Sequence, residues 1–252
     1  MKFLILMGLF VFTTPLLALP EAHTELLPYV QQAPDQGDTN TCWFVASTGA
    51  MELLLNKQYE ITEPLPGGPF DLAESFIIWQ KNFIERNNSP QHFIEEVVRR
   101  FNHGEAVHIS EWPFVAFNEN GTRNMGVWNR HPQFTKLARI QVPQVRTELL
   151  FARGRKYSMR VLRSADIELM KKTLVEKNAP LIINYNDNGF WHVALIVGYD
   201  DSAPGKCYEV ADKECQKTGS FYVRDSKGIR IEARSYSWFL INGNAAAVVE
   251  LK

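Results

Sequence analysis

Cys42 is the residue of this sequence whose position best suits a nucleophile. It follows Asn40 and Thr41, either of which can cap a helix, and apolar residues at helical spacing continue to about Leu55. The reactive form of a cysteine is the thiolate, which the positive end of a helix dipole favours. By position alone, Cys42 is therefore either a reactive thiol or a small, buried apolar residue.

His192 is the one histidine, among six, that has a distinctive setting. It opens an apolar run that ends at Tyr199 and that can form a buried strand. A polar group at the start of such a strand needs a partner. An imidazole beside a cysteine can accept the thiol proton and return it to a leaving group. His192 is either that base or an ordinary core histidine.

The first 18 residues have the pattern of a signal peptide. Lys2 is followed by a continuous apolar run over residues 3–12 and then by a small residue, Ala18, at a cleavage position. The run is shorter than the about 20 apolar residues that a membrane span needs. We therefore expect residues 1–18 to be removed and residues 19–252 to form the mature protein. That protein would be secreted or periplasmic and not bound to a membrane.

Export makes the three cysteines interpretable. Cys207 and Cys215 lie eight positions apart in a polar stretch. Two such thiols usually form a disulfide in an oxidising compartment. Cys42 is far away in sequence and is left over. The sequence therefore predicts a disulfide between Cys207 and Cys215 and a free thiol at Cys42.

Composition and residue spacing argue against several other functions. The 252 residues carry 27 Lys and Arg against 28 Asp and Glu, so the formal net charge of -1 offers no attraction to the phosphates of nucleic acids. His103 and His108 lie five positions apart but have no third ligand nearby for a metal. We expect no nucleic-acid partner, no metal and no cofactor.

The order of the predicted elements indicates an α+β protein. The expected helices cover residues 42–55, 71–85, 91–101 and 164–176; the expected strands cover residues 181–185, 192–199, 220–224, 229–232 and 246–251; and loops extend from 110 to 153. We expect two lobes, a helical one over about 36–110 and a β one over about 150–252. A cleft between two lobes is a common place for a site.

Three segments together carry a further signature. Gln36 lies six residues before Cys42, and Trp43 follows that cysteine. The strand 192–199 ends in Val-Gly-Tyr, and residues 222–228 read Tyr-Val-Arg-Asp-Ser-Lys-Gly. In type, spacing and order these segments resemble the papain-like cysteine peptidase family, and they span most of the mature chain.

The resemblance implies a fold and a set of catalytic residues. The fold would be the papain-like two-lobed one, with a helical N-terminal lobe, an antiparallel β-barrel-like C-terminal lobe and the active site in the cleft. Cys42 would attack a carbonyl carbon, His192 would take and return the proton, and Asp225 would hold the imidazole. Gln36 and the backbone N–H of Cys42 would stabilise the oxyanion. The implied activity is thiol-dependent hydrolysis of peptide bonds.

Two residues depart from the family's pattern near the third catalytic position. Asp225 stands where the family usually has asparagine, and an aspartate stabilises the charged form of His192 more strongly. We expect Asp225→Asn to keep most activity. Lys227 replaces a tryptophan that shields the third residue from water in the family. We therefore expect the bond between His192 and Asp225 to be more exposed to water.

The segment between the signal peptide and Gln36 is short. Residues 19–35 leave no room for the inhibitory pro-segment that precursors of this family carry. We expect a monomer that acts on a peptide or protein substrate. Without a pro-segment, three explanations stay open: its targets lie outside the cell, a separate inhibitor protein restrains it, or it acts on something other than general protein.

Other functions fit the same residues. A Cys-His-Asp acyl transferase of the transglutaminase type also places Cys-Trp on a helix and uses aspartate as its third residue. Bacteriocin-leader and cell-wall peptidases have a related fold. A non-catalytic binding protein that keeps the fold is the contrasting class. It is favoured by Lys227 and by the absence of the Gly-Gly strip that usually lines the substrate cleft in this family. Intact Cys42, His192 and Gln36 favour an enzyme.

Overall fold

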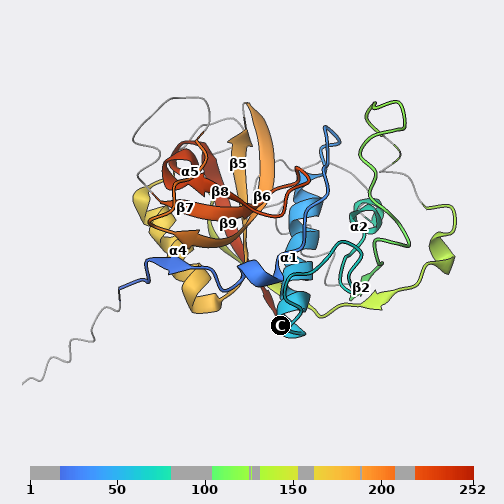
Figure 1. The fold of residues 1–252 in the computed structure, drawn as a ribbon, viewed down its shortest axis with the longest axis horizontal. Coiled ribbons are helices and arrows are strands. Elements are labelled where there is room, and N and C mark those ends of the chain that lie inside the picture. Colours follow the sequence, from blue (N-terminus) through green and yellow to red (C-terminus); the bar gives the residue numbers. More distant parts are fainter. Residues whose placement is uncertain are drawn as a thin grey trace, which may run out of the picture.

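The computed structural model describes residues 18–80, 104–124, 126, 131–152, 162–187, 189–207 and 219–252. The described helices are α1 (Cys42–Gln58), α2 (Glu74–Gln80), α4 (Ser164–Lys177) and α5 (Tyr236–Asn242), with short 3-10 turns η1 (Leu27–Tyr29) and η3 (Phe134–Lys136). The described strands are β1 (Ala22–His23), β2 (Glu105–Ala106), β3 (Ile140–Gln141), β4 (Val145–Ala152), β5 (Leu181–Asp187), β6 (Phe190–Asp200), β7 (Ser220–Arg224), β8 (Glu232–Ser235) and β9 (Gly243–Leu251). Figure 1 shows their arrangement.

Most of the described strands form one antiparallel sheet. Neighbouring strands follow the order β4-β9-β5-β6-β7-β8, and β1 pairs with β6. β2 and β3 pair separately. Among the described strands the sheet runs from β4 to β8 without closing, so the C-terminal lobe is an open antiparallel sheet and the expected barrel-like closure is not found.

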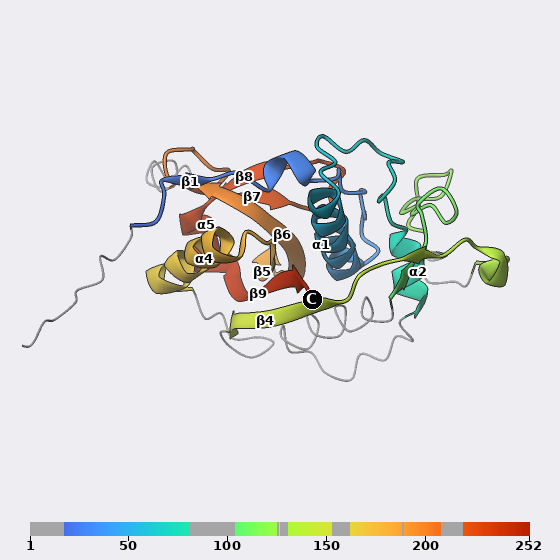
Figure 2. The ribbon, with the colours of Figure 1, turned by 90° about the horizontal axis from the view of Figure 1, so that it is seen from below.

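β5 and β6 form the centre of the sheet because both are nearly continuous apolar runs. Residues 181–185 and 192–199 are buried, with no alternating polar face. A strand of this composition must be covered on both sides. α1 packs against both strands, α5 packs against β5, and α4 packs against β6. In Figures 1 and 2, α4 and α5 lie on the opposite side of these strands from α1.

α1 is a helix without a solvent-facing stripe over most of its length. Every residue from Cys42 to Asn56 is buried. A helix that is apolar on all sides belongs in the interior. In both views α1 lies between the sheet and α2, and it contacts β6 and α2. The buried helix therefore joins the sheet to the rest of the protein and carries Cys42 at its first position.

The structure corrects the expectation of loops from 110 to 153, because β4 covers residues 145–152 of that range. α5 is a second element that the sequence pattern did not predict. The expected helix over 91–101 and all but the last residue of the expected signal peptide, 1–18, lie outside the described residues. Within the described residues, no helix is both long and apolar enough to span a membrane.

Candidate active site

Cys42 is the first residue of α1 and Thr41 is its N-cap. The thiol is free and the residue is 7% exposed. The carbonyl of Thr41 accepts the backbone N–H groups of Phe44 and Val45, while its hydroxyl pairs with that of Thr39 at 2.8 Å. The first backbone N–H groups of an α-helix have no partner within the helix, so they can donate to an anion near the thiol.

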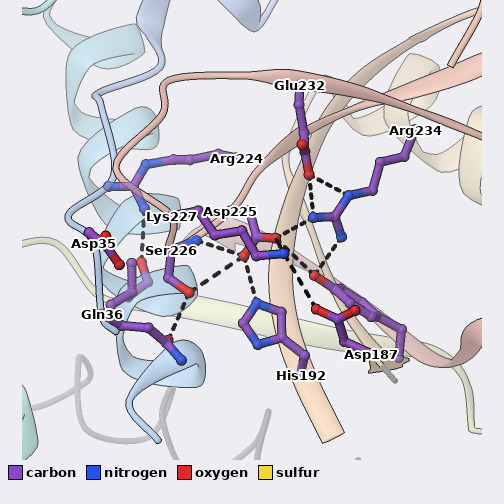
Figure 3. Close-up of polar contacts among 12 residues, drawn as sticks. Asp35, Gln36, Asp187, His192, Arg224, Asp225, Ser226, Lys227, Glu232 and Arg234 are labelled. Atoms are coloured by element: carbon purple, nitrogen blue, oxygen red, sulfur yellow. Dashed lines mark hydrogen bonds and ion pairs between the residues drawn. The ribbon is translucent and has the colours of Figure 1, made fainter. Parts of the chain in front are cut away.

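The loop before Cys42 places Gln36 beside the loop that follows β7. The backbone N–H of Gln36 donates to the carbonyl of Ser226 at 3.0 Å, and the Ser226 hydroxyl donates to Gln36 Oε1 at 2.7 Å (Figure 3). The amide oxygen is thus occupied, which turns the Nε2 donor away from Ser226. Gly37 follows at a φ of 53°, and a Cβ there would lie 2.3 Å from the Phe117 ring, so the turn requires glycine.

His192 is the third residue of β6 and links Cys42 to Asp225. Its Nε2 lies 2.6 Å from Asp225 Oδ1 (Figure 3). The thiol of Cys42 is the other side-chain group that acts on this imidazole, through a hydrogen bond and through its charge. The Tyr185 ring packs edge-on against the imidazole, with centroids 5.1 Å apart. The structure therefore brings the thiol, the imidazole and the carboxylate into one connected set.

The partners of His192 set its protonation state. Burial lowers the pKa of His192, but hydrogen bonds to Asp225 and Cys42 and the negative charges of both raise that pKa to about 10. Burial of Asp225 opposes ionisation, yet the hydrogen bond and charge of His192, with the charges of Arg234 and Lys227, hold the pKa of this carboxyl well below its usual range. Imidazolium and carboxylate are therefore the stable forms at neutral pH.

Asp225 directly follows β7 and is completely buried. Lys227 Nζ lies 3.6 Å from Asp225 Oδ2 and 3.4 Å from Asp187 Oδ2. The expectation that Lys227 exposes the bond between His192 and Asp225 to water is wrong, because the carboxylate has no exposed surface and His192 is only 9% exposed.

Arg224, the last residue of β7, is a buried residue that no sequence pattern identified. Its guanidinium donates to the carbonyls of Gln31 at 2.8 Å and Val45 at 2.9 Å, and to Glu52 Oε2 at 2.9 Å. The end of β7 is thereby attached to the middle of α1, which fixes Asp225 relative to Cys42. The sequence contains an indirect signal for such a residue, because the carboxylate of Glu52 in an apolar helix needs a buried cation as its partner.

The predicted disulfide lies only partly within the described residues. Cys207 Sγ lies 3.4 Å from Ser235 Oγ. Cys215 lies outside the described residues, so the disulfide between Cys207 and Cys215 stays a prediction. The described part of the chain contains no group of three or more His, Cys, Asp or Glu side chains placed to hold a metal ion.

Comparison with known proteins identifies structures of similar fold. No family model and no curated protein matches the sequence of this chain. A digestive procathepsin L proteinase from the larval midgut of Tenebrio molitor is 13% identical with a TM-score of 0.56, over 94% of this chain and 70% of that one. Bromelain from Ananas comosus in complex with an inhibitor is 11% identical with a TM-score of 0.51, over 93% of this chain and 100% of that one.

A third similar structure comes from a bacterium. It contains the cysteine protease and lectin-like domains of Cwp84, a surface-layer-associated protein of Clostridium difficile. It is 15% identical with a TM-score of 0.55, over 92% of this chain and 52% of that one. Each match extends over more than nine tenths of this chain. The chain therefore has the fold of the papain-like cysteine proteases.

Proposed function

We propose that the chain is a cysteine peptidase that hydrolyses peptide bonds through an acyl-enzyme on Cys42. The observation that carries this proposal is the position of His192, whose ring connects Asp225 at 2.6 Å with the thiol at the start of α1. The similarity in fold to proteases of an insect, a plant and a bacterium supports it.

In the proposed reaction Cys42 is the nucleophile, His192 transfers protons while Asp225 holds its ring, and Gln36 helps to stabilise the oxyanion. The sulfur of Cys42 attacks the carbonyl carbon, and the electron pair of the C=O bond moves to the oxygen. The backbone N–H of Cys42 and Nε2 of Gln36 donate to this oxyanion. His192 gives its Nδ1 proton to the departing amine as the C–N bond breaks, and a thioester remains. Water then attacks the thioester while His192 accepts its proton, the C–S bond breaks, and the carboxylic acid leaves with the thiolate and the imidazolium restored.

Hydrolysis of a broad peptide pool by purified protein tests the proposal. Cys42→Ala and His192→Ala should each reduce the rate by roughly 1000-fold or more, because nucleophile and base act as one unit. His131→Gln is the matched control, since His131 lies far from this set in sequence and its ring packs on Trp112. A wild-type protein that cleaves nothing, or a Cys42→Ala variant as active as the wild type, would contradict the proposal.

Acyl transfer to an amine is the second candidate, which Asp225 as third residue favours. Both reactions share the acyl-enzyme and differ in what attacks it. Adding a primary amine to the peptide assay separates them: a hydrolase releases carboxylic acid, whereas a transferase accumulates the new amide. A protein that binds peptides and forms neither product would be the non-catalytic alternative.

We also propose that the mature protein acts after export, as a secreted or periplasmic monomer on peptide or protein substrates. The signal-peptide pattern of residues 1–18 supports export. A separate inhibitor protein as the restraint on activity is part of the same proposal.

A further inference from the structure

The buried carboxylate of Asp225 has two differently occupied oxygens. Oδ1 accepts from His192 Nε2 at 2.6 Å and from the backbone N–H of Ser226 at 2.7 Å. Oδ2 accepts from the Tyr185 hydroxyl at 3.1 Å. It also accepts from Arg234 Nη2 (Figure 3). One oxygen therefore holds the imidazole, and the other is held by the Tyr185 hydroxyl and the Arg234 guanidinium.

Arg234 is fixed as firmly as the carboxylate it binds. The residue is 1% exposed. Its Nη1 donates to the Tyr185 hydroxyl at 2.5 Å, and its Nε donates to Glu232 Oε1 at 2.5 Å. The guanidinium carbon lies 5.1 Å from the centroid of the Tyr185 ring and 5.0 Å from that of Trp238. Every nitrogen of the guanidinium is thus engaged, and the cation cannot turn away from Asp225.

We infer that Arg234 is a positioning residue of the candidate active site: it locks Oδ2 of Asp225 and balances its charge, so that Oδ1 holds the imidazole of His192. This inference rests on the proposed function of that site. It makes residues 225 and 234 interdependent, because the third position requires an acid only as long as the arginine is present.

The hydrogen-bonding groups of an amide show why position 225 requires an acid while Arg234 is present. An asparagine at position 225 would have one acceptor oxygen and one NH2 donor. If the oxygen faces His192, the NH2 group faces Arg234, which has only donors. If the amide turns over, its NH2 group faces the N–H groups of His192 and Ser226. Either orientation sets donor against donor in a buried site, and it leaves the charge of Arg234 without its Asp225 partner.

The electrostatic consequence falls on His192. The titratable and charged groups around the pair formed by His192 and Asp225 are Cys42 of α1, Tyr185 and Asp187 of β5, Lys227 after β7, and Glu232 and Arg234 of β8. Replacing Asp225 by a neutral residue removes the negative charge opposite two cations. The pKa of His192 then falls, so its imidazolium is lost at lower pH. This reverses the expectation, drawn from sequence alone, that Asp225→Asn keeps most activity.

Four proteins test the inference: wild type, Asp225→Asn, Arg234→Met and the double variant. Asp225→Asn should lower kcat/KM by about 100-fold and move the alkaline limb of its pH profile down by at least about one unit. Arg234→Met should lose about tenfold without a downward move of that limb, because Asp225 keeps its charge but loses its orientation. Lys206, whose Nζ lies 3.6 Å from Glu232 Oε2, remains as a partner of Glu232 in that variant.

The decisive protein is the double variant. With methionine at position 234, the NH2 group of the introduced asparagine can donate to the Tyr185 hydroxyl while its oxygen faces His192. The double variant should therefore regain at least about tenfold of the kcat/KM lost in Asp225→Asn, as directly contacting residues show in such cycles. Arg146→Met is the control, because Arg146 is an exposed residue of β4 paired with Glu250. Its kcat/KM should be that of the wild type.

An NMR titration of the His192 ring in the same proteins needs no activity. We expect a lower pKa in Asp225→Asn and a recovered one in the double variant. An active wild type in which Asp225→Asn behaves normally, or in which the double variant is no better than Asp225→Asn, overturns the inference. If Arg234→Met does not fold, Asp225→Asn decides by its own pH profile. An inert wild type with the predicted NMR pattern would contradict the proposed function and leave the pairing of Asp225 with Arg234 standing.

Discussion

Gln36 is oriented by contacts that leave one end of its amide for chemistry. Its backbone N–H and its Oε1 are both bound to Ser226, at 3.0 Å and 2.7 Å. Ser226 directly follows Asp225, so the same loop orients the imidazole-holding carboxylate and the amide. The Nε2 donor is thus preorganised, which is the property that makes a hydrogen bond effective toward a developing negative charge.

Gln36→Ala should lower kcat by roughly 10- to 1000-fold with little change in KM, because the hydrogen bond matters mainly in the transition state. Steady-state kinetics on one peptide measures both constants. The matched control is Gln32→Ala, since Gln32 Nε2 donates to the carbonyl of Gly228 at 2.7 Å and is not placed at the proposed oxyanion. Equal losses of kcat in the two variants would show that Gln36 acts only by holding the loop.

Individual site residues differed in how far sequence could predict them. Cys42, His192 and Gln36 were identifiable because their spacing and neighbours are local in sequence. Arg224 and Arg234 were not, since arginines in a strand are ordinarily solvated and only the folded structure reveals what they reach. Their signal was indirect: Glu52 and Asp225 are acids that a buried setting must pair with cations.

At the scale of elements, Gly49 explains how α1 and β7 come so close. A Cβ at this position would lie 2.0 Å from Nη1 of Arg224. The guanidinium also donates to the carbonyl of Val45, which belongs to the same helix. Glycine at position 49 therefore leaves the space in which the Arg224 side chain crosses the helix.

We expect Gly49→Ala to destabilise the protein, which is the reverse of the usual effect of replacing a helical glycine by alanine. In an exposed helix that replacement stabilises the protein, because glycine is about 1 kcal/mol less favourable than alanine. Here the added carbon displaces a buried, fully engaged cation, so we expect a loss on the order of 1–3 kcal/mol in the free energy of unfolding. Denaturant titration measures it, with Ser47→Ala in the same helix as a control that adds no atom to the core. A gain in stability for Gly49→Ala would show that Arg224 is not confined by α1.

The elements that sequence predicted are those whose apolar runs are long and continuous. The strand predicted over 220–224 matches β7, and those over 181–185 and 192–199 fall inside β5 and β6. β4 was missed because its residues Val145–Ala152 alternate irregularly between buried and exposed, and pairing with β9 decides its conformation. α5 was missed because its aromatic residues favour strands. Its helical start depends on Ser235, the N-cap, whose hydroxyl accepts the backbone N–H of Trp238.

At the scale of the whole molecule, buried carboxyls gather where α1 meets α2. Glu52 Oε1 accepts the backbone N–H of Leu72 at 2.9 Å, and its other oxygen binds Arg224. Glu74 is the first residue of α2 and is also buried. Burial, only partly opposed by the charge of Arg224, raises the pKa of Glu74 from 4.5 to about 7. This junction is therefore sensitive to pH.

Glu74→Gln should stabilise the protein at pH 8 and not at pH 4.5. A carboxyl whose pKa is raised on folding contributes stability that is complete below pH 4.5 and is lost as pH rises through about 7. Glutamine stays neutral, so the gain over wild type at pH 8 should be on the order of 1–3 kcal/mol. Thermal unfolding at both pH values measures it, with the exposed Glu148→Gln as control. The same difference at both pH values would contradict this assignment of the buried carboxyl.

The most direct test of the central claim is covalent labelling of Cys42 by a peptidyl epoxide that alkylates active-site thiols, followed by mass analysis of the labelled peptide. We predict one adduct per chain, on Cys42, and a labelling rate that falls by roughly 100-fold or more in His192→Ala, because the imidazolium keeps the thiolate available. No adduct on the wild type, an adduct on another residue, or an unchanged rate in His192→Ala would contradict it.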